Sequence, residues 1–304
     1  TKPKGRLHET TSQCSFSWLV KSNNKINWNT TVKEIKKEKK FKWGVATSSY
    51  QIEGAHDVDG RGLSVWDVFS HAKGKVKNGD TGDIACDHYN KFSDDIKLMK
   101  DLGVDSYRFS VSWPRIFPVG TEQKINQKGM DFYDRLVDGL LENDITPFLT
   151  LNHWDMPQGL EDLGGWTKRE TVEHFVKYGH YMSRCLGDRV INWITHNEPW
   201  CISFLGYVEG RKPPGLKNEW AKSLHTAHHL LLSHGKVIPE IKSNVRDSKV
   251  GITLNLNTAI PASDSEYDKK ACDFYDAQFN RLYLDPLYNQ KYPRLLFESL
   301  LQKN

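Results

Sequence analysis

The 304-residue sequence predicts an α/β fold, and within that class an incomplete (β/α)8 TIM barrel. From residue 41 onward, apolar segments of strand length alternate with amphipathic segments of helix length, which is typical of parallel sheets built from βαβ units. The strand segments are continuously apolar, as expected where both faces of a sheet are covered. Neither a G-x-G-x-x-G motif nor a P-loop follows the first strand, which disfavours a nucleotide-binding doubly wound sheet.

We expect five strands and five main helices, with right-handed crossovers between successive strands. The expected strands are Phe41–Ser48, Ser106–Trp113, Thr146–Trp154, Asn192–Glu198 and Lys249–Leu256. The expected helices cover residues 88–102, 127–143, 168–186, 217–242 and 264–281. Residues 282–304 leave room for a further helix but not for three more βα units. The sequence therefore predicts about five of the eight units of a barrel.

Local signals mark several element boundaries. The amphipathic spacing of Lys91–Leu102 stops at Gly103, a residue type favoured just after a helix. Asn126 is a candidate N-cap for the next helix, and Thr167 with Glu170 has the spacing of a capping box. Pro199 has no N–H for a strand ladder, so we expect the fourth strand to end before it.

Residues 1–40 are predicted to form a basic, disordered extension, separate from a barrel domain at 41–304. The extension holds ten Lys/Arg and three Asp/Glu, so the net charge of +4 for the whole chain becomes −3 for the remainder. A slightly acidic body disfavours a nucleic-acid groove, and no apolar run approaches the roughly 20 residues needed to cross a membrane. The start resembles no secretory signal, and the five cysteines are odd in number and scattered, so we expect reduced thiols and a cytoplasmic location.

The most informative functional pattern is Asn197-Glu198-Pro199-Trp200 at the end of the fourth strand. In a barrel of parallel strands, the carboxyl ends of the strands carry the active site. A carboxyl group there can protonate a leaving oxygen, while the neighbouring amide binds a hydroxyl and the indole offers a flat face to a sugar ring. The alternative is that Glu198 lies on a solvated loop at the strand end without a catalytic role, and the residues at the other strand ends bear on that choice.

Those strand ends are polar or aromatic as well. Gln51 follows the first strand, Arg108 lies in the second, and His153 and Trp154 end the third. Neutral donors and acceptors, aromatic faces and one acid make up the set of groups that carbohydrate recognition requires. A fixed cation inside a barrel is costly unless it is paired, so Arg108 predicts a nearby buried carboxylate.

Together these segments resemble glycoside hydrolase family 1, the β-glucosidase family. The matching segments are residues 41–54, Tyr107–Pro114, His153–Pro157, Gly164–Trp166, Trp193–Trp200, Gly251–Asn255 and Leu284–Tyr288. The resemblance covers about residues 41–296. It implies a glycosidase-type TIM barrel that hydrolyses β-glycosides with retention, through a covalent glycosyl-enzyme, and that uses neither a metal nor an organic cofactor.

The resemblance also implies residue roles. Glu198 is implied as the acid/base and Arg108 as the support of the catalytic nucleophile. The implied substrate-binding residues are Gln51, His153, Trp154, Asn197 and Trp200. Asn197 is implied to bind the 2-hydroxyl of the sugar. Gln51 and His153 are implied to bind the 3- and 4-hydroxyls, with Trp154 beside them. Trp200 is implied to line the aglycone side.

The sequence departs from the family pattern after the fifth strand. The family's nucleophile is a second Glu in a Thr-Glu-Asn-Gly-like motif on the seventh strand, and no such motif occurs here. Retaining hydrolysis requires two carboxyl groups, so the chain is read as truncated before the nucleophile strand. Three hypotheses stay open: a β-glucosidase-like hydrolase, an inactive sugar-binding barrel, and a fragment that needs a complementary barrel half or self-associates through open edges.

Other polar clusters are interpreted as structural, so no metal site is predicted. His225 and His229 have the i,i+4 spacing of metal ligands, but Thr226 stands where a zinc protease has Glu. Gly60-Arg61-Gly62 is interpreted as a turn. A second set of residues is interpreted as helix caps and turn residues; it comprises His56, Asp57, Asp83, Asp87 and His88.

Overall fold

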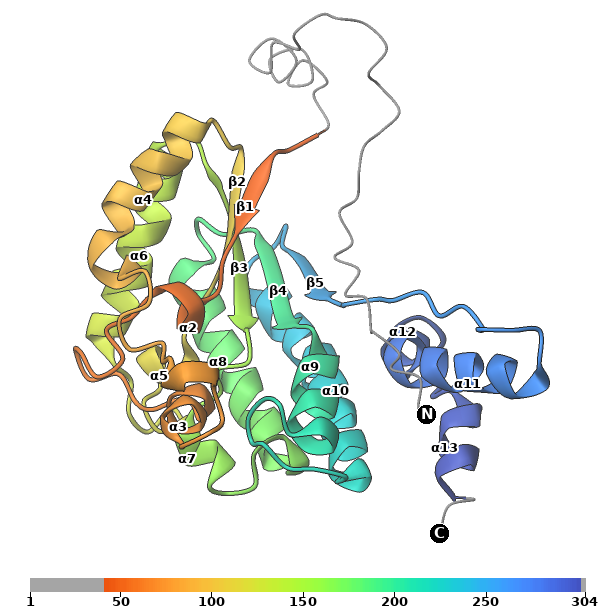
Figure 1. Ribbon diagram of the computed structural model, residues 1–304. Coiled ribbons are helices and arrows are strands. Elements are labelled where there is room, and N and C mark those ends of the chain that lie inside the picture. The colour runs from red at the N-terminus through yellow and green to blue at the C-terminus, as the bar shows by residue number, and fades with distance from the viewer. Residues whose placement is uncertain (1–40, 302–304) are drawn as a thin grey trace, which may run out of the picture. The chain divides into compact units, whose positions relative to one another are not determined.

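The computed structural model describes residues 41–301, and every element below belongs to the compact unit Trp43–Asn304. The predicted extension at 1–40 lies outside the described residues. Five parallel strands form one sheet in chain order (Figure 1). They are β1 (Gly44–Ala46), β2 (Ser106–Ser110), β3 (Thr146–Asn152), β4 (Asn192–Asn197) and β5 (Lys249–Thr253). The prediction of five parallel strands is confirmed, although each strand is shorter than expected.

The helices around this sheet differ in length. The long helices are α4 (His88–Leu102), α6 (Gln127–Glu142), α8 (Glu170–Leu186), α10 (Trp220–Asn244) and α11 (Glu266–Asp276). The short helices are α2 (Ser49–Ile52), α3 (Val65–His71), α5 (Trp113–Ile116), α7 (Gln158–Glu161), α9 (Pro199–Phe204), α12 (Leu282–Asn289) and α13 (Arg294–Leu301). Figure 1 shows α2, α3, α5, α7 and α9 gathered at the end of the sheet toward which the strand arrowheads point. The loops after the strands therefore build one end of the unit.

Single helical turns complete the chain. Two are 3₁₀ turns, η1 (Lys77–Gly79) and η2 (Gly165–Thr167). Two are π turns, η3 (Leu205–Glu209) and η4 (Ala277–Arg281), and they extend α9 and α11 respectively.

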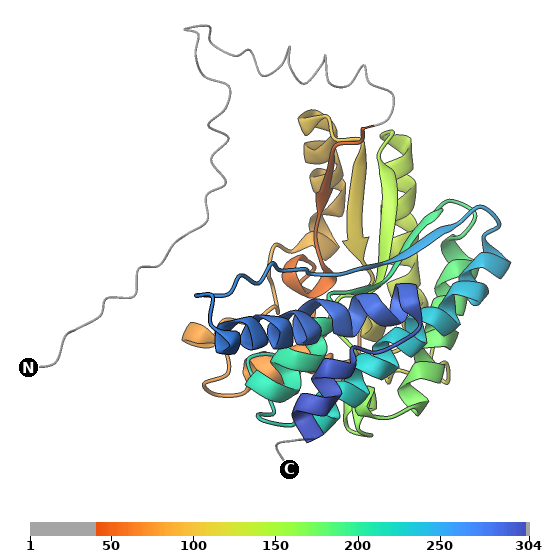
Figure 2. The ribbon, with the colours of Figure 1, turned by 90° about the vertical axis from the view of Figure 1, so that its right-hand side faces the viewer.

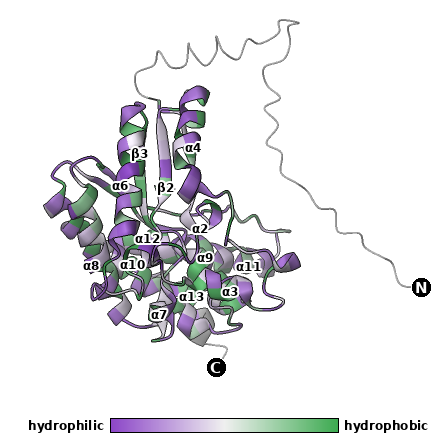
Figure 3. Ribbon diagram, turned by 90° about the vertical axis from the view of Figure 1, so that its left-hand side faces the viewer, coloured by the Kyte–Doolittle hydropathy of each residue, from purple (hydrophilic) through white to green (hydrophobic). Residues whose placement is uncertain are grey.

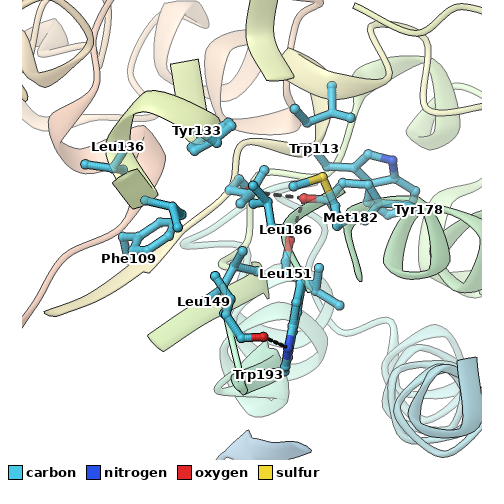
Figure 4. Close-up of a cluster of buried hydrophobic side chains, with 14 of the residues drawn as sticks. Phe109, Trp113, Tyr133, Leu136, Leu149, Leu151, Tyr178, Met182, Leu186 and Trp193 are labelled. Atoms are coloured by element: carbon cyan, nitrogen blue, oxygen red, sulfur yellow. Dashed lines mark hydrogen bonds between the residues drawn. The ribbon is translucent and has the colours of Figure 1, made fainter. Parts of the chain in front are cut away.

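The main core lies between β2–β4 and the helices that cover them (Figure 4). Leu149 and Leu151 of β3 are completely buried. Trp113 stacks on Tyr178 of α8 with ring centroids 5.0 Å apart, and the Tyr178 hydroxyl donates to the Leu151 carbonyl at 3.3 Å. Phe109 of β2 belongs to the same cluster. Because successive strand residues point to opposite faces, the neighbouring Arg108 is directed away from this core.

The covering helices are amphipathic, as their sequences predict. Figure 3 shows hydrophilic and hydrophobic residues together on α4 and α6. In α4 the buried residues include Ile96 and Met99, which are three positions apart and so share one helix face. No helix within residues 41–301 is both long enough and apolar enough to cross a membrane.

A second, smaller cluster holds the C-terminal helices. Ala227 and Leu231 of α10 pack with Leu282 and Tyr283 of α12 and with Leu296 of α13. Figure 2 shows the chain leaving β5 and continuing into these helices, drawn in dark blue. No residue of α11 is buried. In the described part of the chain, the fifth βα unit is thus much less covered than the four before it.

Several predicted boundaries are confirmed. Helix α4 covers residues 88–102 as predicted, and Gly103 ends it in the left-handed region, with φ of 70°. Strand β4 ends at Asn197, and Pro199 begins α9 at a position where a missing N–H costs nothing.

The predicted capping box at Thr167 is wrong. Helix α8 begins at Glu170 with Arg169 in the N-cap position, because Thr167 belongs to the preceding η2 turn. There the Thr167 hydroxyl donates to the Gly164 carbonyl at 2.6 Å.

Asn126 does occupy the N-cap position of α6, but its side chain makes no capping hydrogen bond and donates to a backbone carbonyl of α5 instead.

Candidate functional site

Glu198 follows the last residue of β4 and has a strained backbone. Its φ is 47°, in the left-handed region that costs a non-glycine residue about 1–2 kcal/mol. Two backbone hydrogen bonds hold it there: the Glu198 N–H donates to the Thr253 carbonyl, and the Cys201 N–H donates to the Glu198 carbonyl, both at 2.8 Å. The half-buried side chain also accepts a hydrogen bond from the Cys201 thiol at 3.4 Å. Backbone strain maintained in this way is common at functional sites.

Arg108 reaches the residue next to Glu198. Its Nη2 donates to Asn197 Oδ1 at 2.6 Å, and its Nε donates to Thr150 Oγ1 at 3.0 Å. Burial lowers the pKa of Arg108, and the negative charge of Glu198 offsets that effect only in part. The side chain therefore faces the same region as Asn197 and Glu198.

The prediction that a buried carboxylate pairs with Arg108 is wrong for the described residues. No carboxylate oxygen among them lies within 4.0 Å of the guanidinium. Neutral oxygens of Thr150 and Asn197 accept its hydrogen bonds instead, and the side chain is only half-buried, so part of its charge is still solvated.

His153 and Trp154 follow β3 and lie beside this group. Trp154 has a φ of 77°, which is unusual for a large aromatic residue, and its Nε1 donates to the Asn197 carbonyl at 2.8 Å. Its ring lies edge-on to that of His153, with centroids 4.8 Å apart. Burial, together with the positive charges of Arg108 and Lys212, lowers the pKa of His153 to about 3. The imidazole is therefore neutral at pH 7, and its buried Nδ1 has no partner among the described residues.

Gln51, His153 and Trp154 line one cavity of about 300 Å³. The other lining residues are Ser48, Tyr50, Trp66, Ser70, Val76, Asp80, Thr81, Gly82 and Ala85. Tyr50 and Trp66 stack there with ring centroids 5.7 Å apart. An aromatic wall with a few polar groups is the usual character of a small-molecule site. The hydrogen bond between Trp154 and Asn197 connects this cavity to Glu198.

Trp200 lies apart from that cavity. It stacks on Phe204 at 5.0 Å and contacts Phe279 at 4.3 Å, both measured between ring centroids. The structure thus brings six of the seven predicted site residues to neighbouring strand ends and places the seventh among aromatic side chains of α9 and η4.

Sequence reasoning missed one charged neighbour, Lys212. Its Nζ lies 3.1 Å from the centroid of the Trp154 ring, a close cation–π contact. Burial lowers the pKa of Lys212, against the opposing effects of Cys201 and Glu198. The local signal is only a Lys before two prolines, and nothing in that pattern indicates a distance to the third strand.

The other polar residues singled out in the sequence have hydrogen-bond partners or positions typical of structural residues, with one exception. His229 Nδ1 is 2.9 Å from the Trp166 carbonyl oxygen, and His88 Nδ1 is 2.6 Å from an oxygen of Asp95. Asp87 occupies the N-cap position of α4, although its side chain makes no capping bond. The exception is the pair His56 and Asp83, which lie close to a third residue, as described below.

Comparison with known proteins shows the family to which the chain belongs. The family model described as glycosyl hydrolase family 1 matches residues 34–304. The chain belongs to glycosyl hydrolase family 1. Its five parallel strands match part of the family's TIM barrel.

Several relatives are similar over the same region. A 1,4-beta-D-glucan glucohydrolase of Thermotoga neapolitana is 48% identical over 260 residues, which are 85% of this chain and 60% of the relative. Beta-glucosidase A of Acetivibrio thermocellus is 50% identical over 255 residues, or 84% of this chain and 56% of the relative. The structure of a Thermotoga maritima beta-glucosidase in complex with deoxynojirimycin superimposes with a TM-score of 0.82 at 47% identity, covering 85% of this chain and 58% of that one. The chain thus spans somewhat more than half the length of these relatives.

Proposed function

We propose that this chain carries the acid/base side of a retaining β-glucosidase of family 1. Glu198 is the acid/base, and the cavity lined by Gln51, His153 and Trp154 receives the glucosyl unit. The observation that carries the proposal is the cluster at the carboxyl ends of β2 to β4. There a strained Glu198 adjoins an amide that is already bound by Arg108. The activities that name the relatives, beta-glucosidase and glucan glucohydrolase, agree with this assignment.

In this mechanism two carboxyl groups divide the work. Glu198 as a carboxylic acid donates its proton to the leaving oxygen, while a second carboxylate attacks the anomeric carbon. The resulting glycosyl-enzyme is then hydrolysed by a water molecule, whose proton Glu198 accepts. We assign the second carboxylate to the part of the barrel that this chain does not include. The guanidinium of Arg108, whose hydrogen-bond partners among the described residues are neutral, is the group that pairs with it.

The sugar contacts follow from the groups that are already engaged. Asn197 Oδ1 accepts from Arg108, so its Nδ2 is the group left to bind the 2-hydroxyl. The neutral imidazole of His153 and the amide of Gln51 can each accept and donate, as the 3- and 4-hydroxyls require. Lys212 covers one face of Trp154, which leaves the other face for the sugar ring. Trp200 lines the aglycone side.

A second candidate is sugar binding without turnover by the chain alone. It is favoured by Arg108, which has no carboxylate partner among residues 41–301. In the described sheet β1 and β5 are the edge strands, each paired on one side. Such edges pair readily with other strands. The partner we propose is a complementary barrel part, with self-association as the competing outcome.

The cysteines Cys86, Cys185, Cys201 and Cys272 are free thiols, which supports a reducing, cytoplasmic setting.

Complementation tests the proposal. The 304-residue chain is assayed with dinitrophenyl and alkyl β-glucosides, alone and co-expressed with the carboxyl-terminal part of the Thermotoga maritima beta-glucosidase. We expect turnover only in the combination. Glu198→Ala should lower activity about 10²–10⁴-fold on the alkyl glucoside. It should spare the formation of the glycosyl-enzyme from the dinitrophenyl substrate, and azide should restore the second step. Glu240→Ala, in an exposed pair with His180, is the control and should keep its activity.

Binding gives a readout that does not depend on complementation. Deoxynojirimycin is titrated calorimetrically into the chain alone and into His153→Ala. We expect binding to the unmodified chain and at least tenfold weaker binding to the variant. Equal affinities would show that the cavity beside Trp154 is not the sugar site, and unchanged activity of Glu198→Ala on alkyl glucosides would remove Glu198 from the mechanism.

A further inference from the structure

Three segments converge beside the cavity, and each contributes one side chain of a type that can bind a metal ion. His56 lies in the loop after α2, His71 ends α3, and Asp83 lies in the loop before α4. His71 Nε2 lies 3.0 Å from both oxygens of Asp83, and His56 Nδ1 lies 4.0 Å from Asp83 Oδ1. One nitrogen or oxygen from each of the three residues lies within 4.8 Å of the others.

The backbones that carry these side chains are held in place independently of the cluster. Arg61 donates to the His56 carbonyl at 2.8 Å and pairs with the completely buried Asp67 at 2.9 Å. Gly54 approaches the other loop so closely that an added Cβ would lie 2.2 Å from the Ile84 carbonyl oxygen. The three ligand groups are therefore brought together by packing and by a buried ion pair. A preformed arrangement of this kind lowers the entropic cost of binding an ion.

We propose that His56, His71 and Asp83 bind a divalent transition-metal ion, with Zn²⁺ as the best fit. Two imidazole nitrogens and one carboxylate oxygen form a ligand set that zinc accepts. With zinc–ligand bonds of about 2.0–2.1 Å, tetrahedral ligand atoms lie about 3.3 Å apart. The observed separations of 3.0 and 4.0 Å lie on either side of that value. The exposed carboxylate of Asp57, 3.6 Å from His56 Nδ1, or water completes the coordination.

A bound ion would restrict the position of the loop at 72–87 relative to the elements that line the cavity, because Asp83 lies in this loop and the two histidines lie outside it. Asp80, Thr81, Gly82 and Ala85 of this loop are lining residues, and the Gly82 N–H donates to the Tyr50 hydroxyl at 3.2 Å. The role is structural, since no ligand of the ion lines the cavity itself. The proposal extends beyond the β-glucosidase assignment and does not depend on it.

Zinc titration of the full chain tests the site directly. We expect one Zn²⁺ per chain by calorimetry at pH 7.5 with a phosphine reductant present, and a rise in the unfolding temperature. Asp83→Asn and His71→Ala should each weaken binding at least tenfold. Cys86→Ser, three positions from Asp83, and His225→Ala, in the histidine cluster of α10, are matched controls that should bind as the unmodified chain does.

Limited proteolysis provides a second readout at the same place. Lys73, Lys75 and Lys77 are exposed in the loop between His71 and Asp83. Zinc should slow trypsin cleavage there in the unmodified chain and leave it unchanged in Asp83→Asn. Far-UV circular dichroism identifies any variant that fails to fold, and His56→Gln then replaces it. Zinc binding that survives Asp83→Asn, or that disappears in His225→Ala or Cys86→Ser, would overturn the proposal, as would no binding at all.

Discussion

Two arginines seven positions apart, Arg108 and Arg115, differ in what surrounds their charge. Arg115 is paired with a carboxylate, whereas Arg108 has neutral hydrogen-bond partners among the described residues. Arg115 is completely buried, and its Nε donates to Glu53 at 3.0 Å while its Nη2 donates to the Gly54 carbonyl at 3.1 Å. Burial by itself lowers the pKa of Arg115, but the charge of Glu53 and its hydrogen bond outweigh that effect and raise it. For Arg108 the balance is reversed, and its pKa is lowered.

The difference separates two kinds of cation. The charge of Arg115 stabilises the fold through its carboxylate partner, whereas the charge of Arg108 is available to a ligand. Glu53 also accepts a hydrogen bond from Tyr133 at 2.5 Å through its second oxygen, so the charge of Arg115 is balanced by a carboxylate that the described fold holds in place, although Arg115 Nη1 has no partner there. Within residues 41–301, the hydrogen bonds of Arg108 go to neutral oxygens only, and the negative charge of Glu198 raises its pKa without fully offsetting burial. A cation without a carboxylate partner among the described residues is a candidate for pairing with a substrate or with another part of the barrel.

The largest effect is expected where the buried ion pair of Arg115 and Glu53 is broken. Arg115→Met leaves the Glu53 carboxylate buried and unpaired, which should lower the free energy of unfolding by about 3–5 kcal/mol. Urea denaturation of the chain measures the loss. The double variant Glu53→Gln/Arg115→Met removes both charges and should recover part of it. If the double variant is less stable than Arg115→Met, the unpaired carboxylate is not the cause.

A smaller effect is expected from pH, because His153 lies near Arg108 and its protonation is linked to folding. The free energy of unfolding should therefore depend on pH through this residue. Its pKa is about 6.5 when unfolded and about 3 in the folded protein. Below pH 6.5 the unfolded chain therefore binds a proton that the folded chain does not, and stability falls as the pH falls. Between pH 6.5 and 5 this should cost about 2 kcal/mol, at about 1.4 kcal/mol per pH unit.

The matched variant His153→Gln isolates this contribution. Burial raises the pKa of Asp155 and of Glu161 to about 7, so these groups bind protons in the folded state and oppose the trend. They are present in both proteins, and their effect cancels in the difference. We expect the unfolding free energy of the variant to fall less between pH 6.5 and 5. Parallel pH profiles for the two proteins would mean that His153 is protonated in the folded state.

Much of this comparison was predictable from the sequence, because strand ends in a parallel barrel meet at one edge. The prolines and glycines located the boundaries: Pro199 ended β4 and Gly103 ended α4. Long helices carried enough apolar periodicity to be recognised. The four-residue helices α2, α5 and α7 did not, since a single turn shows no periodic pattern.

What the sequence could not predict depends on competing local hydrogen bonds and on contacts between distant segments. Thr167 has the spacing of a capping residue, but a nearby carbonyl, that of Gly164, takes its hydroxyl. Lys212 contacts Trp154 across 58 positions, and His56, His71 and Asp83 come together only through the packing of three loops. For Arg108 the strand position was predictable, whereas the choice of neutral acceptors depends on the register that places Thr150 and Asn197 beside it.

The smallest effect on stability is expected at Arg108, where a change should matter for function instead. Arg108→Met loses two hydrogen bonds to neutral oxygens, each worth about 0.5–1.5 kcal/mol. It also removes a charge that its surroundings disfavour, as the lowered pKa indicates. The two contributions oppose each other, so the free energy of unfolding in urea should change by no more than about 1 kcal/mol. In the complemented enzyme the same variant should lose most of its turnover, because the second carboxylate then lacks its cation. A stability loss as large as that of Arg115→Met would instead make Arg108 a structural residue and erase the contrast between the two arginines.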